Sequence, residues 1–476
     1  MGEEISTTTF SREDFASFAA RLARETDALG RCFGDGSLSD SGYTWGFELE
    51  AWLLDHGFHP VPRNAELLEA LASPDVVPEL SRFNVELNTP VRDFAPRTFS
   101  AAAQDLAGLW TRCNAVAHGL DANMVMIGTL PTIRERDLSL ANISPLKRYY
   151  ALNHELLAAN RGRPLEIRIN GRERLALSHS DVMLEAAATS FQVHFKIPVS
   201  LAHRYYNASL ALSAPILAAA VNAPILFDRV LWDETRIPLF EQAIAGAAGP
   251  AAARPRVTFG SGYLEHSLFE CFAENQADFP VLLPIRFDDD QAHALRHLRL
   301  HNGTIWRWNR PLVGIENDGA HVRLEHRALP AGPSLADMIA NAALYLGAVH
   351  EWVMRDCVGR VTAGEAQANF YTAARDGLDA TLACDGRRRE AAAWLLDELI
   401  GDADAGLARL GIDVDERDRW LGIVRARVAC GQTGAAWQRA CYLAHERHPY
   451  RLMATYCELQ RSGAPVHEWP AGGASP

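Results

Sequence analysis

Hydrophobic and polar residues alternate along several short segments of the chain, a pattern that predicts β-strands. In TWGFELEAWLL, at 44–54, apolar side chains occupy the odd positions from 45 to 51, whereas Glu48 and Glu50 occupy the opposite face. Side chains two positions apart in a strand lie on one face, about 7 Å from each other. Two interpretations of the paired carboxylates stay open: a half-solvated strand of an antiparallel sheet, or a site that holds a divalent cation.

Four further segments share this pattern, and of these the segment 301–311 is less regular. Their polar positions are occupied by glutamate, histidine and arginine, where generic polar residues would suffice for solubility. By segment, these residues are Glu79 and Glu86 in ELSRFNVELNTPV (79–91), Gln192, His194 and Lys196 in SFQVHFKIP (190–198), Arg307 and Arg310 in HNGTIWRWNRP (301–311), and Arg323, Glu325 and Arg327 in HVRLEHRALP (321–330).

These residue types suit metal ions and phosphate groups. Carboxylate oxygens and imidazole nitrogens are ligands for Mg²⁺ or Mn²⁺, and arginine binds phosphate and carboxylate groups through paired hydrogen bonds. Taken singly, His194 also fits a structural role, and Glu325 fits a salt-bridge ladder between its arginine neighbours. Taken together, the five segments predict a basin for metal ions and a nucleotide.

Turn and capping signals place two further elements. The segment 6–30 predicts a helix that Ser11 and Asp14 cap at its start and that Gly30 ends. The Asn-Gly pair in the middle of PLEIRINGRERLALSHSDVML, at 164–184, predicts a β-hairpin.

Helical patterns dominate the later part of the chain. The apolar segment 210–227 predicts a buried helix broken near its prolines, and 388–411 and 434–463 are helical by period and composition. The Gly- and Pro-rich tail is expected to be disordered at its end. We therefore expect an N-terminal helix at 1–42, a main domain of mixed strands and helices at 43–350, a helical C-terminal region at 351–462 and a tail at 463–476.

The composition excludes several classes of protein. The 476 residues are 48% hydrophobic and 22% charged, as in an ordinary globular protein, and the net charge of -13 argues against a nucleic-acid partner. The eight cysteines have no metal-finger spacing, and the N-terminal residues lack a secretory signal. We expect a cytoplasmic protein with small-molecule substrates and no membrane partner; the oligomeric state is open.

Common nucleotide-binding and hydrolase motifs do not occur in the sequence. There is no G-x-x-x-x-G-K-[ST], and GSGYLEH at 260–266 lacks the third glycine of a dinucleotide-binding loop. Neither H-E-x-x-H nor G-x-S-x-G is present. If the protein uses ATP, a structure other than a P-loop must hold it.

Several segments resemble a known family. GFELE, VELNTPV, VHFKIP and RLEHR resemble, in this order, characteristic segments of the glutamate-cysteine ligases and related carboxylate-amine ligases of the glutamine synthetase superfamily. GTIWRWNRP and ALPAGPSLADMIANAALYLG look like the bacterial branch of that family. The similarity extends in patches over 43–350, and PVHEW near the end of the chain is similar as well.

The resemblance implies a fold and a reaction. The fold is α+β, an antiparallel sheet curved into a funnel with helices outside it and a helical C-terminal region, and 43–350 would be the catalytic ligase domain. The reaction uses ATP with Mg²⁺ or Mn²⁺: the γ-phosphoryl group passes to a carboxylate, and an amine attacks the resulting acyl phosphate. With glutamate and cysteine as substrates it would belong to glutathione biosynthesis, although the sequence leaves both substrates open.

The resemblance also implies roles for individual residues. The implied metal ligands are Glu48, Glu50, Glu79, Glu86, His194 and Glu325; the implied nucleotide contacts are His194, Glu325 and Lys196; and Arg327, Arg307 and Arg310 would face the phosphoryl group or the substrate. Two alternatives stay open: a phosphotransferase of the same superfamily, such as a guanidino kinase, and a non-catalytic relative that binds a metal or a nucleotide.

Overall fold

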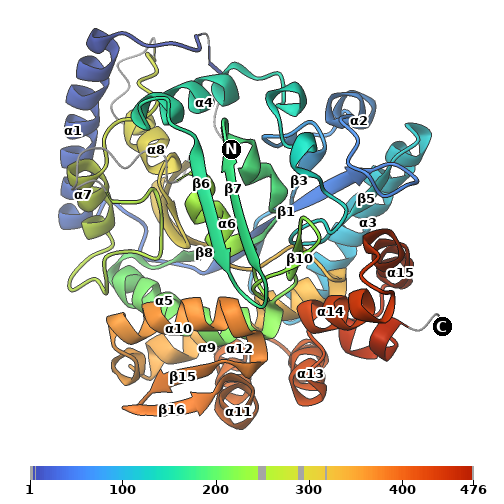
Figure 1. The fold of residues 1–476 in the computed structure, drawn as a ribbon. Helices are drawn as coiled ribbons and strands as arrows, with labels where there is room; N and C mark the ends of the chain where they lie inside the picture. Colours follow the sequence, from blue (N-terminus) through green and yellow to red (C-terminus); the bar gives the residue numbers. More distant parts are fainter. Residues whose placement is uncertain (1–3, 6, 245–253, 288–293, 317–318, 474–476) are drawn as a thin grey trace.

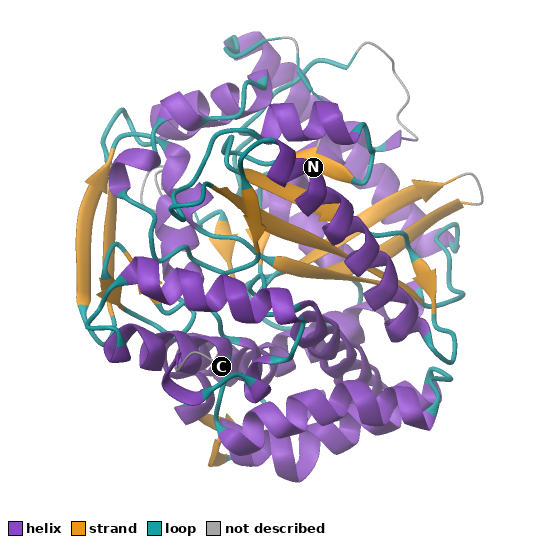
Figure 2. Ribbon diagram, turned by 90° about the vertical axis from the view of Figure 1, so that its right-hand side faces the viewer, coloured by secondary structure: helices purple, strands orange, loops and turns teal. Residues whose placement is uncertain are grey.

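A single large sheet lies at the centre of the protein (Figures 1 and 2). The computed structural model describes residues 4–5, 7–244, 254–287, 294–316 and 319–473. The strand order is β13-β14-β8-β1-β3-β2, every pairing is antiparallel, and β4 and β5 pair with the two ends of β1. The strands are β1 (Thr44–Leu54), β2 (Val76–Pro78), β3 (Asn84–Asn88), β4 (Arg92–Asp93), β5 (Asn123–Val125), β8 (Phe191–Ile197), β13 (Asn309–Glu316) and β14 (Gly319–His326).

The alternation seen in the sequence matches the two faces of this curved sheet, and the predicted α+β fold is confirmed. Apolar side chains such as Phe47, Val193 and Leu324 are buried on one face. The opposite face is polar but also covered, since Glu86 and Glu325 are each only 1% exposed. Glu48 and Glu50 themselves are only partly covered, so the burial of this face does not by itself decide between the two interpretations of the paired carboxylates.

Helices cover the apolar face. They are α3 (Thr98–Gly119), α5 (Ala202–Ala220) and α9 (Leu335–Met354), and the last two are buried along almost their whole length. The apolar segment at 210–227 thus contains the expected buried helix. The helix continues through Pro215 and ends only before Asn222 and the second proline, so a break at the first proline is wrong.

Different elements lie over the polar face. They are the 3₁₀ helix Val182–Ala187, α6 (Arg236–Ala243) and the hairpin of β6 (Leu165–Asn170) with β7 (Arg174–His179), which crosses the front of the molecule in Figure 1. The hairpin predicted from the Asn-Gly pair is confirmed. These elements close the polar basin from outside.

The remaining elements surround this core. The other helices are α1 (Arg12–Asp35), α2 (Asn64–Leu71), α4 (Lys147–Ala159), α7 (Phe269–Asp278), α8 (Arg296–Gly303), α10 (Ala363–Asp376), α11 (Ala391–Trp394), α12 (Ile400–Arg409), α13 (Val414–Cys430), α14 (Gly434–Ala444) and α15 (Pro449–Ser462). The other strands are β9 (Ile225–Leu226), β10 (Arg229–Val230), β11 (Val257–Thr258), β12 (Trp306–Arg307), β15 (Thr381–Cys384) and β16 (Arg387–Glu390).

Two expectations about local structure are wrong near the N-terminus and before β13. Helix α1 has the expected Ser11 and Asp14 cap but passes through Gly30, which packs under the ring of Phe269, and ends at Gly36 with φ 76°. The segment 301–311 is not one strand: it holds the end of α8, the short β12 and the start of β13. Strand β12 pairs in parallel with β11 outside the main sheet.

The C-terminal part is mostly helical, with one exception. Residues 388–390, expected to be helical, form strand β16 of a hairpin with β15. The Asp385-Gly386 turn explains this hairpin, since both residues have positive φ. Helix α9 continues across residue 350 and packs closely on α12, where a Cβ at Gly406 would lie 2.0 Å from the carbonyl oxygen of Gly347. The division of the chain at 350 stays a prediction.

The tail after α15 packs onto the protein. Trp469 is 3% exposed, and its ring lies edge-on to Trp437 and Tyr456. The expected disorder concerns 474–476, which lie outside the described residues. No helix in the described part of the chain combines the length and hydrophobicity that a bilayer crossing needs.

Candidate functional site

A row of ionisable side chains crosses the polar face from β14 through β8 to β1. Glu325 lies opposite His194 in the pairing of β14 with β8, and His194 lies opposite Gly46 on β1. Glu48, two residues further along β1, reaches the imidazole: its Oε1 lies 3.0 Å from His194 Nε2. Glu325 Oε1 lies 3.7 Å from the same nitrogen. One ligand atom from each of Glu48, His194 and Glu325 lies within 4.8 Å of the others.

A second cluster consists of carboxylates alone. Glu50 on β1 lies opposite Glu86 on β3, and Glu79 joins them from the segment that follows β2. Oxygens of the three residues lie within 4.8 Å of one another. The two clusters lie side by side on one face, since Glu48 and Glu50 are two residues apart in the same strand.

Hydrogen bonds hold part of the second cluster in place. The backbone N–H and the hydroxyl of Ser190 donate to the two oxygens of Glu50, at 2.7 and 2.9 Å, and Gln192 Nε2 donates to Oε1 at 2.9 Å. Asn88 Nδ2 donates to Glu86 at 3.0 Å. In contrast, Glu79 Oε1 is buried and has no hydrogen-bond partner among the described residues. The cluster therefore contains a buried lone pair that a cation would satisfy.

Burial and mutual repulsion change the acidity of this cluster. Burial, with the charge of Glu86, raises the pKa of Glu50 to about 7. Burial, with Glu86 and Glu50 nearby, raises the pKa of Glu79 well above its ordinary value. Burial and the charge of Glu48 raise the pKa of Glu86. Three acids so close together cannot all ionise at neutral pH without a compensating positive charge.

In the first cluster the pKa values of the carboxylates are lowered instead of raised. Burial disfavours the charge of Glu325, but Arg310 and Arg327 outweigh it and hold the pKa of Glu325 well below its usual value. Arg310 binds Glu325 through two hydrogen bonds, of 2.6 and 2.9 Å, and Arg327 Nη1 lies 3.1 Å from Glu325 Oε2. His194 likewise lowers the pKa of Glu48 against the effect of burial. The two carboxylates of this cluster therefore stay ionised at neutral pH.

Two of the sequence-predicted residues lie apart from the clusters. Arg307 is buried in β12, where it donates to Asn275 Oδ1 at 2.7 Å and lies 3.3 Å from Glu274. Lys196 lies further along β8, opposite Thr44 and Arg323. The structure thus brings the predicted acids, His194, Arg310 and Arg327 together. The roles of Arg307 and Lys196 stay predictions.

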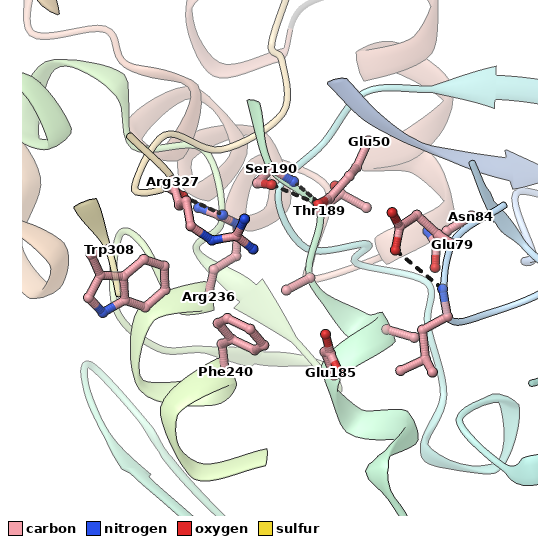
Figure 3. A pocket seen from close by; sticks show the side chains of 13 residues that line it. Glu50, Glu79, Asn84, Glu185, Thr189, Ser190, Arg236, Phe240, Trp308 and Arg327 are labelled. Atoms are coloured by element: carbon pink, nitrogen blue, oxygen red, sulfur yellow. Dashed lines mark hydrogen bonds between the residues drawn. The ribbon is translucent and has the colours of Figure 1, made fainter. Parts of the chain in front are cut away.

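A cavity opens beside the carboxylate cluster (Figure 3). Its volume is about 50 Å³, and it is partly open to solvent. Its lining residues are Glu50, Glu79, Leu80, Asn84, Glu185, Ala186, Ala188, Thr189, Ser190, Arg236, Phe240, Trp308 and Arg327. The cavity thus adjoins Glu50 and Glu79 of the second cluster and Arg327.

Sequence reasoning missed Arg236 and Glu185 in this lining. Arg236 begins α6 and donates to Glu234 at 3.0 Å and to the carbonyl of Ala328 at 3.1 Å. Burial, followed by the charge of Glu50, raises the pKa of Glu185 to about 7. Neither residue lies on a strand of the main sheet, so alternation could not have revealed them; the helix and 3₁₀ helix that carry them reach the cavity only through tertiary packing.

The side chains present fit divalent cations. The donor sets are three carboxylates in one cluster, and two carboxylates with an imidazole in the other; these are oxygen-rich sets of the kind that Mg²⁺ and Mn²⁺ accept. The buried, unpartnered Glu79 Oε1 and the raised pKa values of its neighbours point the same way.

Comparison with solved structures finds proteins of similar fold. Among solved structures, the chain is similar to glutamate-cysteine ligase from Francisella tularensis in complex with AMP, with a TM-score of 0.57, 13% identity and 92% of each chain covered. It is also similar to a bifunctional glutathione synthetase from Pasteurella multocida, with a TM-score of 0.47 and 11% identity over 92% of this chain and 55% of that one. No curated protein matches the chain.

The family itself is shown by sequence. The model of glutamate-cysteine ligase family 2 matches residues 44–455, which include both clusters, the cavity and most of the C-terminal helices. The match confirms the resemblance of the strand segments and extends it beyond residue 350. The chain therefore belongs to glutamate-cysteine ligase family 2, a family of ligases.

Proposed function

We propose that the protein is an ATP-dependent carboxylate-amine ligase that activates the side-chain carboxylate of glutamate, or of a similar amino acid, and joins it to an amine. The observation that carries this proposal is a pair of neighbouring acidic clusters, the second of which lines a cavity together with Arg327. Membership of a ligase family supports the same class of reaction.

Each cluster has a place in this reaction. Glu48, His194 and Glu325 would hold one divalent cation, and Glu50, Glu79 and Glu86 another. When bound, such cations neutralise the charge of the ATP phosphates and of the transferred phosphoryl group.

The arginines position the reacting groups. Arg327 is held by Glu325 and by a hydrogen bond to Gln192, so its guanidinium is fixed at the cavity wall. We assign it to the oxygens of the transferred phosphoryl group, where a preorganised cation stabilises developing charge. Arg310 holds Glu325 from the other side, and Arg236 supplies a second cation at the cavity for the carboxylate of the acid substrate.

Two bond exchanges complete the reaction. A carboxylate oxygen of the acid attacks the γ-phosphorus of ATP; the new O–P bond forms as the bond to ADP breaks. The amine nitrogen then attacks the acyl carbon, the C–N bond forms, the C–O bond to phosphate breaks, and the nitrogen loses its proton. The covered polar face keeps water away from the acyl phosphate, which would otherwise be hydrolysed.

The test is product analysis with purified protein and Mg-ATP. Acids and amines are supplied singly and in pairs, with glutamate plus cysteine among the pairs, and ADP, phosphate and amide are measured. Release of ADP and phosphate that requires both substrates supports the ligase. ADP with a phosphorylated product and no phosphate would favour the guanidino kinase-like alternative, and nucleotide binding without any ADP would favour a non-catalytic relative.

A further inference from the structure

Glu185 is an acid in the cavity that the proposed reaction does not use. It lies in the 3₁₀ helix Val182–Ala187, and its Oε2 is buried without a hydrogen-bond partner among the described residues. Glu50, on the opposite side of the cavity, has donors on both oxygens. A buried carboxylate oxygen with no donor is costly unless a ligand supplies one.

The other charged groups of the cavity already have partners or roles. Figure 3 shows Arg236 and Arg327 on one side of the cavity, Glu50 and Glu79 on the other, and Glu185 below them. Arg236 and Arg327 are the only cationic residues among the described residues that line the cavity. In the proposed reaction Arg236 binds the carboxylate of the acid substrate, and Arg327 binds the transferred phosphoryl group. Glu185 is therefore left to face a positively charged group of the ligand.

Two aromatic rings also line the cavity. Phe240 lies near Glu185 in Figure 3, and Trp308 lies further away, beyond Phe240. The ring centroids of Phe240 and Trp308 are 5.9 Å apart at an interplanar angle of 70°. Trp308 is fixed by a hydrogen bond of 3.0 Å from its Nε1 to Glu241. Such rings favour an apolar group and tolerate a nearby cation on their faces.

We infer that Glu185, Phe240 and Trp308 form the subsite for the amine substrate, and that this substrate is a primary amine without a carboxylate group. The inference rests on the proposed ligase function. The carboxylate binds the ammonium group, and the rings pack against the carbon chain. An amino acid in this position would bring a second carboxylate near Glu185, with no cation left among the described lining residues to pair with it.

The first test uses the unaltered protein. With Mg-ATP and the acid that the product analysis identifies, kcat/KM for phosphate release is measured for matched acceptors: cysteine against 2-aminoethanethiol, alanine against ethylamine, and phenylalanine against 2-phenylethylamine. The amine is expected to exceed its amino acid by more than about tenfold in each accepted pair. A smaller ratio, or a preference for the amino acid, overturns the inference.

The second test replaces the carboxylate. E185Q keeps the shape of the side chain and removes its charge, and E166Q on β6 is the matched control, because Glu166 is exposed. E185Q is expected to raise KM for the amine by at least about tenfold while KM for ATP and for the acid change less than about twofold. An unchanged KM for the amine overturns the inference. If the unaltered protein forms no ADP with any acid and amine, the ligase proposal itself fails, and the inference fails with it.

Discussion

Glu50 and Glu86 lie directly opposite each other in the antiparallel pairing of β1 with β3, with their carboxylates in one buried cluster. Like charges in directly opposed positions destabilise a strand pair, and burial adds a further cost. Burial and the charge of Glu86 accordingly raise the pKa of Glu50 to about 7. The structure keeps an arrangement that costs stability, as expected of a site selected for ligand binding.

Removing one charge from this cluster is expected to stabilise the metal-free protein. Glu79 has a buried oxygen without a partner and lies beside two other acids, so E79Q should raise the free energy of unfolding at pH 8 by about 1–2 kcal/mol. The midpoint of thermal unfolding should rise by about 1–2 °C. The control is E69Q, on the exposed side of α2, which should leave the midpoint of thermal unfolding unchanged. A lower midpoint for E79Q would contradict the electrostatic argument.

Metal binding is expected to become tighter as pH rises. The pKa of Glu50 is raised from 4.5 to about 7, and that of Glu79 is raised well above its ordinary value. The folded metal-free protein therefore binds more protons than the unfolded chain, and its stability falls as pH rises through this range. A cation needs the deprotonated carboxylates and must displace these protons.

The measurement is the shift in thermal unfolding caused by Mn²⁺ at pH 6 and pH 8. The shift should be larger at pH 8, and calorimetry in buffers of different ionisation enthalpy should detect proton release on binding. The same Mn²⁺ titration on E79Q should give a much smaller shift. Equal shifts at both pH values would argue against a metal site at these acids.

Loss of charge at Glu325 is expected to abolish turnover. E325Q weakens the hold on Arg310 and Arg327 and removes a ligand of the first cluster, so ATP turnover should fall by at least about a hundredfold. The matched control is E398Q, because Glu398 also binds two arginines, Arg360 and Arg389, but lies in the C-terminal region. Circular dichroism checks that both variants are folded. Full activity of E325Q would refute the assignment of Glu325 to the site.

The packed tail is expected to matter for stability. W469A removes a ring that lies 5.0 Å from Trp437 and 5.3 Å from Tyr456, measured between centroids. The free energy of unfolding in urea should fall by about 3–5 kcal/mol. The control is V91A, at a side chain that is 72% exposed, and it should change the free energy of unfolding little. A W469A protein as stable as the parent would show that the tail contributes nothing to the fold.

Some errors in the sequence-based predictions have a common physical cause. Gly30 has the residue type of a helix stop, yet it lies inside α1 because the ring of Phe269 packs where a larger side chain would clash. The segment 301–311 alternates like a strand, yet β12 within it pairs with β11 outside the main sheet. In both places a contact with a distant segment decided the outcome, and local pattern contains no information about such contacts.

The sequence by itself determined which residues share a strand face, because the period of two in a strand is a local property. It therefore identified Glu48, Glu50, Glu86, His194, Arg323, Glu325 and Arg327 as members of polar faces. Only the tertiary structure decided that β14, β8, β1 and β3 are neighbours in one sheet, so that these faces form two clusters. It also brought Arg236 and Glu185 to the cavity, since strand register and helix packing depend on long-range burial of apolar surface.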